Sequence, residues 1–445
     1  MVSTRAASWS RVRGDTVLAL ITFFYWLTHE NIFFLNALEV GGPLFYTAVN
    51  ALKFCLPVVL LVAVGLPPVS VLTRGRLSLY AMLFAGFLVW ALVPTVLFGD
   101  VETWVKFAIR FPGFVAVAAL WRKRPNSFIT YAKCLVVVVI VALAQLIMVY
   151  LTGSYNDDVA MANGTLAGPF GLYGNVAAQF YLPGVPMPIV RLSGLWQEPS
   201  LAASSAYGGF FLCKYLVAVG ESRKWRAAGY ACLVAGVLTM SNAGAFAFGL
   251  GLLAGVLFKK SKLTVRHLGQ FAVVLPLTAL LLFVAFGRSY FVEHAGGNVW
   301  VLALTGTRSM AVGDDPTSGR LELFQATIDA TKQNWIGVGV QPVGFGGIPA
   351  SASAPVMWLL LTGVPGLLLL VGRELTVLAA ARRLGNRPAL IPLVQALVVV
   401  MAQQLSYGTW MTPHYFALAA IVLVSASGAQ RSLPGAMIQS GDHCA

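Results

Sequence analysis

Charged residues are scarce in this chain. They make up 10% of its 445 residues, whereas hydrophobic residues make up 58%. A soluble domain carries about 25% charged residues, so water cannot be the main solvent here. Long apolar runs recur from one end of the chain to the other. The sequence therefore predicts a single membrane-embedded domain over residues 1–445, an all-α polytopic protein with the lipid bilayer as its solvent.

Signatures of disulfide frameworks, metal sites and nucleotide sites are also missing. The five cysteines are scattered and form no CxxC pair: Cys55, Cys134, Cys213, Cys232 and Cys444. They predict neither a disulfide framework nor a zinc site. The histidines His29, His294 and His414 lack metal-ligand spacing, and no phosphate-binding Walker pattern occurs. We therefore expect no metal and no cofactor.

The formal net charge of +14 raises the question of nucleic acid as a partner. The basic residues, however, form short clusters between apolar runs, which is the positive-inside pattern of membrane proteins. No basic stripe interleaved with aromatic residues is present, so we expect no nucleic-acid binding. Membrane lipids are the expected surroundings.

Apolar runs long enough to span a bilayer recur along the chain. A spanning helix needs about 20 apolar residues. Twelve windows qualify: 16–38, 42–65, 77–98, 103–121, 131–152, 199–219, 225–241, 243–258, 267–287, 354–372, 388–404 and 411–428. The first is too long for the core of a cleaved signal peptide, so we expect it to be retained as a span.

The charges between these windows alternate. Basic clusters fall in every second gap, and the intervening gaps hold Glu39, Asp100 with Glu102, Asp157 with Asp158, and the segment 288–353. Twelve spans with both termini in the cytoplasm satisfy the positive-inside rule throughout. Residues 429–445 are then a cytoplasmic tail.

Two of the predicted extracytoplasmic loops are long, at residues 153–198 and 288–353. Loops of more than about 15 residues are usually either functional or disordered. These two contain aromatic residues and turn sequences such as Leu182-Pro183-Gly184. We therefore interpret them as the functional side of the protein.

Arg191 and Glu198 lie where the first long loop re-enters the membrane. Glu198-Pro199-Ser200 has the pattern of a helix start, with a carboxylate in the cap region and proline at the first helical position. One interpretation makes Arg191 a headgroup contact and Glu198 a helix cap. The other makes Glu198 a base, or the partner that orients the arginine.

Arg320 is the second residue of the segment GRLELFQATIDATKQNW, in which Leu321, Phe324, Ile328 and Trp335 have helical spacing. This pattern predicts an amphipathic helix at the membrane interface. An arginine in the first turn opposes the helix dipole. An anion bound by the guanidinium and by the free backbone N–H groups would account for its position.

Four other cations are weaker candidates for contact with an anion. Lys106 and Arg110 are four residues apart, which places them on one face of a helix near the outer end of its span. They are either headgroup anchors that reach outward or contacts to a lipid pyrophosphate. Arg288 and Arg308 lie in the second long loop.

With these residues located, the chain resembles the O-antigen ligase and polymerase superfamily of bacterial cell-envelope glycosyltransferases. The resemblance rests on four stretches in order, which together with the topology cover about two-thirds of the chain. They are RLSGLWQEPSLAA from Arg191, LTMSNAGAFAFGL from Leu238, SGRLELFQATIDATKQNWIGVG from Ser318 with its Gly-x-Gly, and MWLLLTGVPGLLLL from Met357 with its Gly-x-x-Gly.

Two positions depart from the pattern of that superfamily. Asn242 stands where the family often has arginine. Ligases and many of their relatives carry a histidine shortly before the helix that begins near Met357, but this chain has Ser351 and Ser353 there and no histidine. The departure favours an exopolysaccharide or O-antigen polymerase over a ligase.

The resemblance implies a GT-C-like architecture in the bacterial cytoplasmic membrane. It also implies transfer of a glycan from undecaprenyl diphosphate to an acceptor sugar hydroxyl on the outer side, without a metal. Arg191 and Arg320 would then hold the pyrophosphate, with Arg288 or Arg308 assisting and Glu198 activating the acceptor. Other polysaccharide assembly proteins are candidate partners.

The alternatives are an O-antigen ligase acting on a lipid A-core acceptor and, from another class, a secondary transporter. A transporter predicts an internal repeat and charged or broken helices near mid-membrane. We find no internal repeat, and the arginines of interest lie in predicted outer loops.

Overall fold

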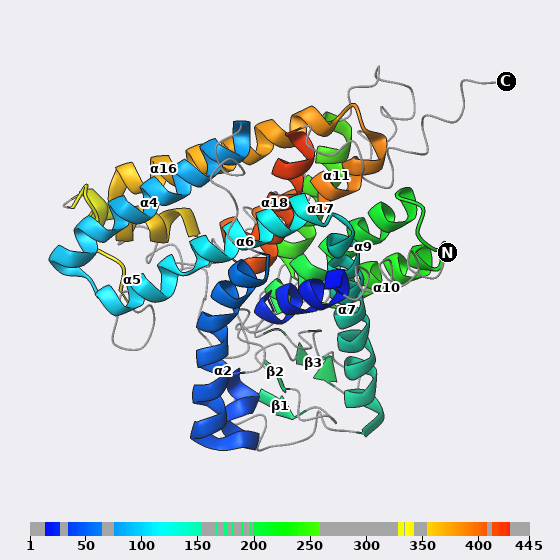
Figure 1. The fold of residues 1–445 in the computed structure, drawn as a ribbon. Coiled ribbons are helices and arrows are strands. Elements are labelled where there is room, and N and C mark those ends of the chain that lie inside the picture. Colours follow the sequence, from blue (N-terminus) through cyan, green and yellow to red (C-terminus); the bar gives the residue numbers. More distant parts are fainter. Residues whose placement is uncertain are drawn as a thin grey trace, which may run out of the picture.

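The computed structural model is built of helices (Figure 1). It describes residues 14–26, 34–64, 75–152, 165–167, 173–175, 180–181, 188–189, 192, 196, 199–239, 241–258, 328–332, 334–341, 354–406 and 412–427.

The helices follow the apolar runs of the sequence. The first described helix is Gly14–Trp26. Those that follow are α2 (Phe34–Val64), α4 (Gly75–Phe98), α5 (Val101–Ala108), α6 (Arg110–Lys123), α7 (Asn126–Thr152), α9 (Pro199–Ala218), α10 (Lys224–Leu238), α11 (Asn242–Leu257), α16 (Ala354–Leu384), α17 (Ile391–Ser406) and α18 (Pro413–Ala426), with a 3-10 turn η3 at Pro388–Leu390.

Two small hairpins occupy part of the first long loop. Strand β1 (Thr165–Ala167) pairs with β2 (Tyr173–Asn175), and β3 (Phe180–Tyr181) pairs with β4 (Pro188–Ile189), both antiparallel. In the view of Figure 1, β1 to β3 lie between the lower parts of α2 and α7. The regular secondary structure in the described part of the chain is thus helical apart from these short strands.

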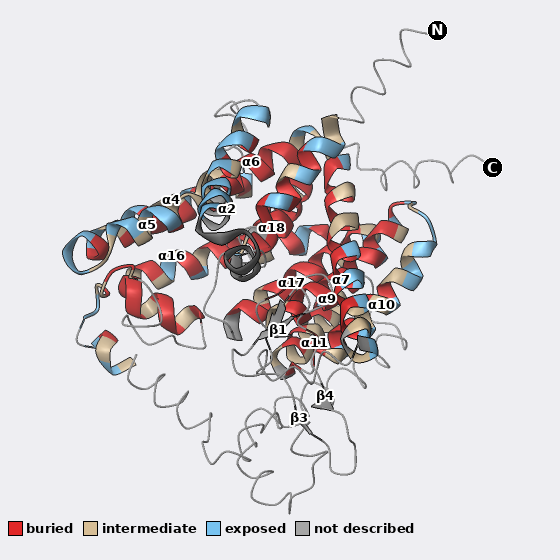
Figure 2. Cartoon of the chain, turned by 90° about the horizontal axis from the view of Figure 1, so that it is seen from below, coloured by how far each residue is buried: buried red, intermediate tan, exposed pale blue. Residues whose placement is uncertain are grey.

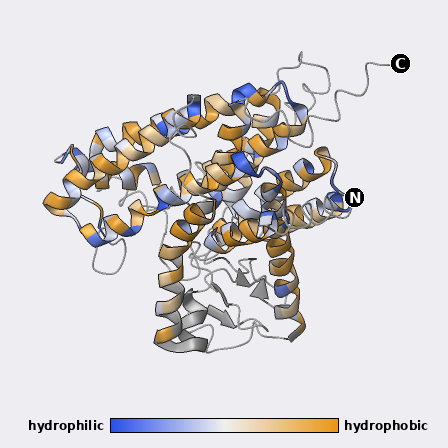
Figure 3. Ribbon diagram, in the orientation of Figure 1, coloured by the Kyte–Doolittle hydropathy of each residue, from blue (hydrophilic) through white to orange (hydrophobic). Residues whose placement is uncertain are grey.

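Within the described residues, five helical stretches are long and apolar enough to cross a membrane: Gly75–Phe98, Val101–Lys123, Asn126–Met148, Ser200–Ala218 and Ala354–Leu384. The same residues contain five shorter apolar helices. Figure 3 shows the apolar colouring running along the helices. The chain is therefore a helical, membrane-embedded protein. The count of twelve spans stays a prediction, and its window 267–287 lies outside the described residues.

Two predicted boundaries are wrong. The gap expected at Glu39 is helical, because α2 runs from Phe34 to Val64 without a break. The span expected to end at residue 372 continues to Leu384. In both places a charged residue lowered the local hydropathy, but hydropathy is not what ends a helix. Arg373 and Glu374 lie inside α16, where their side chains are paired with each other.

Helix α18 forms the centre of the bundle. Each residue from Tyr415 to Val424 is at most 1% exposed. It packs against α4, α6, α16 and α17, and Figure 2 shows buried residues concentrated around it. A helix that is apolar on all sides must be covered on all sides, and here neighbouring helices do so.

Several contacts join helix ends that the charge pattern predicts to share one side of the membrane. They are Arg124 with Asp15 (2.6 Å), Lys123 Nζ with the Val64 carbonyl (2.8 Å), Lys133 with Glu221 (2.7 Å) and Arg387 with the Ser425 carbonyl (3.4 Å). The contacts thus join these ends in pairs. That all of them lie on the cytoplasmic side remains a prediction.

Helix α16 is broken at Gly363, where φ is +67°. The segment 334–341 packs against this break. Val338 N–H donates to the Leu360 carbonyl at 3.0 Å, and Val364 N–H donates to the Trp335 carbonyl at 3.1 Å. The backbone groups that the break frees are therefore satisfied by another stretch of chain.

The same segment also binds the end of α4. Asp100 N–H donates to the Val340 carbonyl at 2.8 Å, and Val340 N–H donates to the Thr95 hydroxyl at 2.9 Å. Gly337 and Gly339 have φ of +99° and +80°, which only glycine adopts readily. We call residues 334–341, together with the break at Gly363, the glycine crossing. It ties the end of α4 to the first part of α16.

Candidate functional site

Most of the predicted site residues lie outside the described residues, namely Arg191, Glu198, Arg288, Arg308 and Arg320. Ser351 and Ser353 also lie outside them. The structure therefore tests their surroundings rather than their side chains. Lys106 and Arg110 are described, and the stretches next to Arg191, Glu198 and Arg320 are described in part.

Lys106 and Arg110 have different surroundings. Lys106 is about half exposed and forms an ion pair with Glu102 in the same helix. Arg110 is partly buried, and its guanidinium carbon lies 5.1 Å from the centre of the Phe107 ring. The prediction placed the two on one face of one helix. In the structure Lys106 belongs to α5 and Arg110 begins α6, and Arg110 is the more buried of the two.

Asp100 caps helix α5, at the turn between α4 and α5. Its carboxylate accepts the backbone N–H groups of Glu102 and Thr103, each at 3.1 Å. The hydrogen bond from the Thr103 hydroxyl is the main reason that the pKa of Asp100 lies below its usual range. The carboxylate of Asp100 therefore stabilises the start of α5.

The re-entry segment that contains Arg191 and Glu198 is held at two points. Leu192 N–H donates to the Leu238 carbonyl at 2.9 Å. Trp196 is 1% exposed, and its ring centre lies 6.4 Å from that of Trp26. Helix α9 begins at Pro199, as the sequence predicted. Arg191 is thus next to the hydrogen-bonded Leu192, and Glu198 is two positions after the buried Trp196.

His414 lies in the same cluster. Its ring centre is 5.9 Å from that of Trp26, and its Nδ1 is 3.1 Å from the Tyr131 hydroxyl. The side chain is 2% exposed. Among the described residues, its Nε2 has no hydrogen-bond partner, and neither have the indole nitrogens of Trp26 and Trp196. We call Trp26, Trp196 and His414 the histidine cluster.

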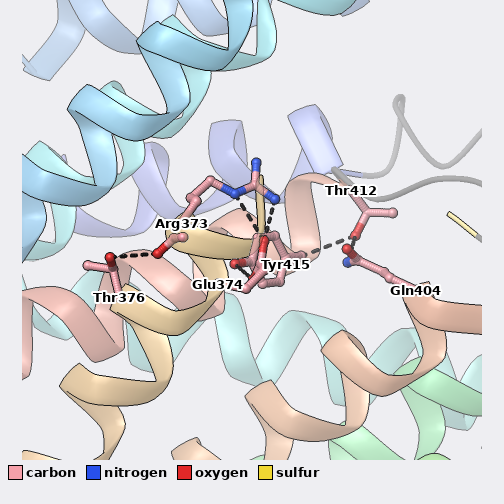
Figure 4. A network of polar contacts seen from close by, with 7 residues as sticks. Arg373, Glu374, Thr376, Gln404, Thr412 and Tyr415 are labelled. Carbon is pink, nitrogen blue, oxygen red and sulfur yellow. Dashed lines mark hydrogen bonds and ion pairs between the residues drawn. The ribbon is translucent and has the colours of Figure 1, made fainter. Parts of the chain in front are cut away.

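Figure 4 shows a second buried polar group, which contains Arg373, Glu374 and Tyr415. Arg373 is fully buried and donates from Nε and Nη2 to Oε1 of Glu374, the Nε bond being 3.0 Å long. The Tyr415 hydroxyl donates to Oε2 of the same carboxylate. The guanidinium carbon lies 5.1 Å from the Phe84 ring centre and 5.6 Å from that of Tyr80.

The first turn of α18 brings the two groups together. Thr412 caps this helix by accepting Tyr415 N–H at 3.2 Å, and Pro413 occupies its first turn. Gln404, near the end of α17, donates to the same Thr412 hydroxyl at 3.4 Å. His414 and Tyr415 are consecutive at the start of α18. His414 belongs to the histidine cluster, and Tyr415 belongs to the group with Arg373 and Glu374.

The two groups differ in what they can do chemically. Both carboxylate oxygens of Glu374 are engaged, and aromatic rings surround the Arg373 guanidinium. This group joins α16 to α18 and α4. The histidine cluster instead presents ring nitrogens with no described partner, next to the segment that carries Arg191 and Glu198. Its three side chains are at most 2% exposed, so it forms a buried polar contact beside that segment.

The sequence reasoning missed Arg373, Glu374 and the role of His414. Two adjacent opposite charges inside an apolar run are a signal of an intramembrane ion pair, but the predicted span stopped one residue before them. His414 follows proline at a helix start in the last apolar run. That position could have indicated a buried histidine.

Within the described residues, no group of three or more His, Cys, Asp or Glu side chains could hold a metal ion. Comparisons with protein families, with curated proteins and with solved structures found no match. The resemblance to the O-antigen ligase and polymerase superfamily therefore stays a prediction from the four motifs.

Proposed function

We propose that this protein is a polysaccharide polymerase of the outer side of the bacterial cytoplasmic membrane. It transfers a glycan from undecaprenyl diphosphate to the hydroxyl of an acceptor sugar. In this proposal the chain has twelve spans, both termini are cytoplasmic, and the loops 153–198 and 288–353 form the active side.

One observation supports the proposal most directly. The Gly-x-Gly motif at Gly337 and Gly339 and the Gly-x-x-Gly motif at Gly363 belong to separate stretches of the resemblance. In the structure they pack on each other in the glycine crossing, where Gly339 N–H donates to the Leu361 carbonyl at 2.9 Å. Two motifs that form one structural unit are less easily explained by chance than two unrelated loops.

The proposed chemistry needs fixed positive charge. Departure of the lipid diphosphate develops negative charge, and preorganised donors in a water-poor site stabilise it. We assign this role to Arg191 and Arg320, assisted by Arg288 or Arg308. The glycine crossing begins two residues after the helical residues 328–332, so it would hold the predicted Arg320 helix at one end. Arg110, which is partly buried, is a weaker candidate.

The direct test is glycan extension by the purified protein. Lipid-linked repeat units would be extracted from a strain that lacks this gene and supplied to the protein in liposomes. We expect products of two or more repeat units, released from one carrier and joined to another, with EDTA causing no loss. Repeat units that stay single under all conditions would rule out the polymerase.

A deletion strain separates polymerase from ligase. Loss of a polymerase leaves single repeat units on the carrier and no long glycan. Loss of a ligase leaves long glycan on the carrier and a bare acceptor. We expect the first pattern, because the family histidine before Met357 is missing; the second would establish a ligase.

A secondary transporter is the second candidate, and two observations favour it. Transporters use broken helices and buried charges, and here α16 is broken at Gly363 and buries Arg373 with Glu374. A transporter would move the lipid-linked units across the liposome membrane and leave them at their original length. Measuring both length and sidedness in the extension assay decides between the two.

A further inference from the structure

Helix α4 provides two side chains that bind the backbone of the glycine crossing. Trp90 Nε1 donates to the Thr362 carbonyl at 2.7 Å, directly before the break in α16. The Thr95 hydroxyl accepts the N–H of Val340 at 2.9 Å. One side chain therefore holds the α16 part of the crossing, and the other holds the segment 334–341.

The hydrogen bond from Trp90 satisfies the last of three carbonyl groups at the break. The consecutive carbonyls of Leu360, Leu361 and Thr362 all accept from outside α16. The first two accept backbone N–H groups of the segment 334–341, at 3.0 and 2.9 Å, and the third accepts the indole N–H of Trp90. Buried backbone carbonyls need such partners, and an indole nitrogen can only donate. The break thus depends on α4 as well as on the segment that crosses it.

The surroundings of Thr95 set the donor and acceptor roles of its hydroxyl. It donates its proton to the Ala91 carbonyl of its own helix at 2.6 Å, so it presents a lone pair to the N–H of Val340. Thr95 and Val340 are 1% and 3% exposed, so water does not reach this bond. Valine has nearly the shape of threonine but no hydroxyl. It would leave the N–H of Val340 without this acceptor.

The segment held in this way leads to the proposed active side. It begins two residues after residues 328–332, which are helical and belong to the predicted helix that follows Arg320. Helix α4 runs along α16 (Figure 1) and also packs against α18, so it is a firm support. Displacing a catalytic group by about 1 Å can cost about 100-fold in rate. The position of the crossing is therefore expected to matter for the reaction.

We propose that Thr95 and Trp90 are positioning residues for the glycan transfer. They hold the glycine crossing against α4 and, through it, the end of the predicted helix that carries Arg320. This inference rests on the proposed function, in which Arg320 stabilises the charge of the leaving lipid diphosphate. Both side chains act on backbone that leads to the site.

Replacing Thr95 by valine and by serine separates its hydroxyl from its methyl group. In the extension assay, Thr95→Val should lower kcat by up to about 100-fold. KM for the lipid-linked repeat unit should change little, because Arg320 acts on charge that develops in the transition state. Thr95→Ser keeps the hydroxyl and should retain kcat. Trp90→Phe keeps an aromatic ring without the N–H and should lower kcat as Thr95→Val does.

Thr22→Val is the matched control. Thr22 is 2% exposed, and its hydroxyl donates to the Leu18 carbonyl of its own helix at 2.9 Å. The same substitution there removes a bond within the first helix, which takes no part in the crossing. We expect an unchanged kcat. All rates are compared per mole of folded protein.

A distance measurement tests the same link without substrate. In a background without the native cysteines, Val105→Cys in α5 and Lys332→Cys before the crossing would carry spin labels, since both side chains are exposed. Pulsed EPR should give one narrow distance distribution in the otherwise unchanged protein and in Thr95→Ser. The distribution should be broader in Thr95→Val and in Trp90→Phe.

The two measurements together decide the inference. A narrow distribution or an unchanged kcat in Thr95→Val would overturn it, and so would an equal loss of kcat in Thr22→Val. If Thr95→Ser loses as much as Thr95→Val, the methyl group matters and the hydrogen bond does not. If wild-type protein extends nothing, the proposed function fails and the positioning role fails with it. The EPR result would then still show whether α4 holds the crossing.

Discussion

Arg373 is the residue whose surroundings are hardest to explain by lipid solvation. An unpaired charge inside a bilayer costs several kcal/mol. Here the Arg373 guanidinium donates to one carboxylate oxygen of Glu374, and the Tyr415 hydroxyl donates to the other. Because the two charged residues are neighbours in sequence, their pairing needs no distant element. The tyrosine adds the link from α16 to α18.

Glu374→Gln should destabilise the protein by about 3–5 kcal/mol, because it leaves the guanidinium of Arg373 buried without its counter-charge. The double variant Arg373→Met with Glu374→Gln should recover part of that loss, since neither charge is then buried. Unfolding in mild detergent with increasing SDS measures both. A double variant less stable than Glu374→Gln alone would show that Arg373 has a further role beyond the pair.

Arg320→Lys should be nearly as damaging as Arg320→Ala. A guanidinium fork binds a diphosphate through two parallel hydrogen bonds, which a point charge cannot reproduce. Loss of one such contact in the transition state costs roughly 2–4 kcal/mol, which is about 30- to 1000-fold in rate. Glycan extension at equal protein level measures this. Full activity in the lysine variant would make Arg320 a headgroup anchor.

At the level of elements, the glycine crossing depends on close contact between its backbone segments. A Cβ at Gly339 would lie 2.6 Å from the Pro94 carbonyl oxygen, and one at Gly337 would lie 2.6 Å from the Leu361 carbonyl oxygen. Neither neighbour is a flexible side chain that could move. The crossing therefore needs glycine for its space as well as for its positive φ.

Gly363→Ala should be more damaging than Gly86→Ala. At Gly363, φ is +67° and a Cβ would collide with the Trp335 carbonyl oxygen. The positive φ costs a non-glycine residue about 1–2 kcal/mol, and overpacking costs about 1–3 kcal/mol more. Gly86 is a mid-helix glycine of α4 with room for a methyl group. SDS unfolding of both variants measures the difference, and equal stabilities would mean that the two segments do not cross as described.

Hydropathy predicted where the helices lie because spanning helices need apolar surface along their length. The start of α9 at Pro199 was also predictable, since proline at the first helical position has a local cause. The break at Gly363 was not, because it depends on a segment more than twenty residues earlier in the chain. The burial of Arg373 was missed for a similar reason. Hydropathy scores it as polar, whereas its partners make it part of the core.

For the site, the sequence predicted arginines and a carboxylate in loops, and these lie outside the described residues. What it could not predict is how a loop residue meets the bundle. The sequence pattern assigned Trp196 no role of its own, but in the structure it packs against Trp26, which is 170 positions earlier. Contacts between residues so far apart in the sequence produce no periodic pattern from which they could be predicted.

At the scale of the whole molecule, the arrangement of charge predicts which face lies on which side of the membrane. The contacts of Arg124 with Asp15 and of Lys133 with Glu221 join helix ends in two pairs. Positive-inside bias predicts that all of these ends are cytoplasmic. The hairpin strands and the glycine crossing then belong to the outer side, where the proposed substrate is delivered.

Labelling of single cysteines tests that arrangement. In a background without the five native cysteines, Thr165→Cys lies in β1 and Val312→Cys lies in the second long loop. Both should react with a membrane-impermeant maleimide in intact cells once any outer membrane has been made permeable. Arg226→Cys, in a predicted cytoplasmic cluster near the start of α10, is the matched control and should react only after lysis. If the two loop cysteines needed lysis and the control did not, the orientation would be reversed and the proposed site would face a compartment where this glycan is not assembled.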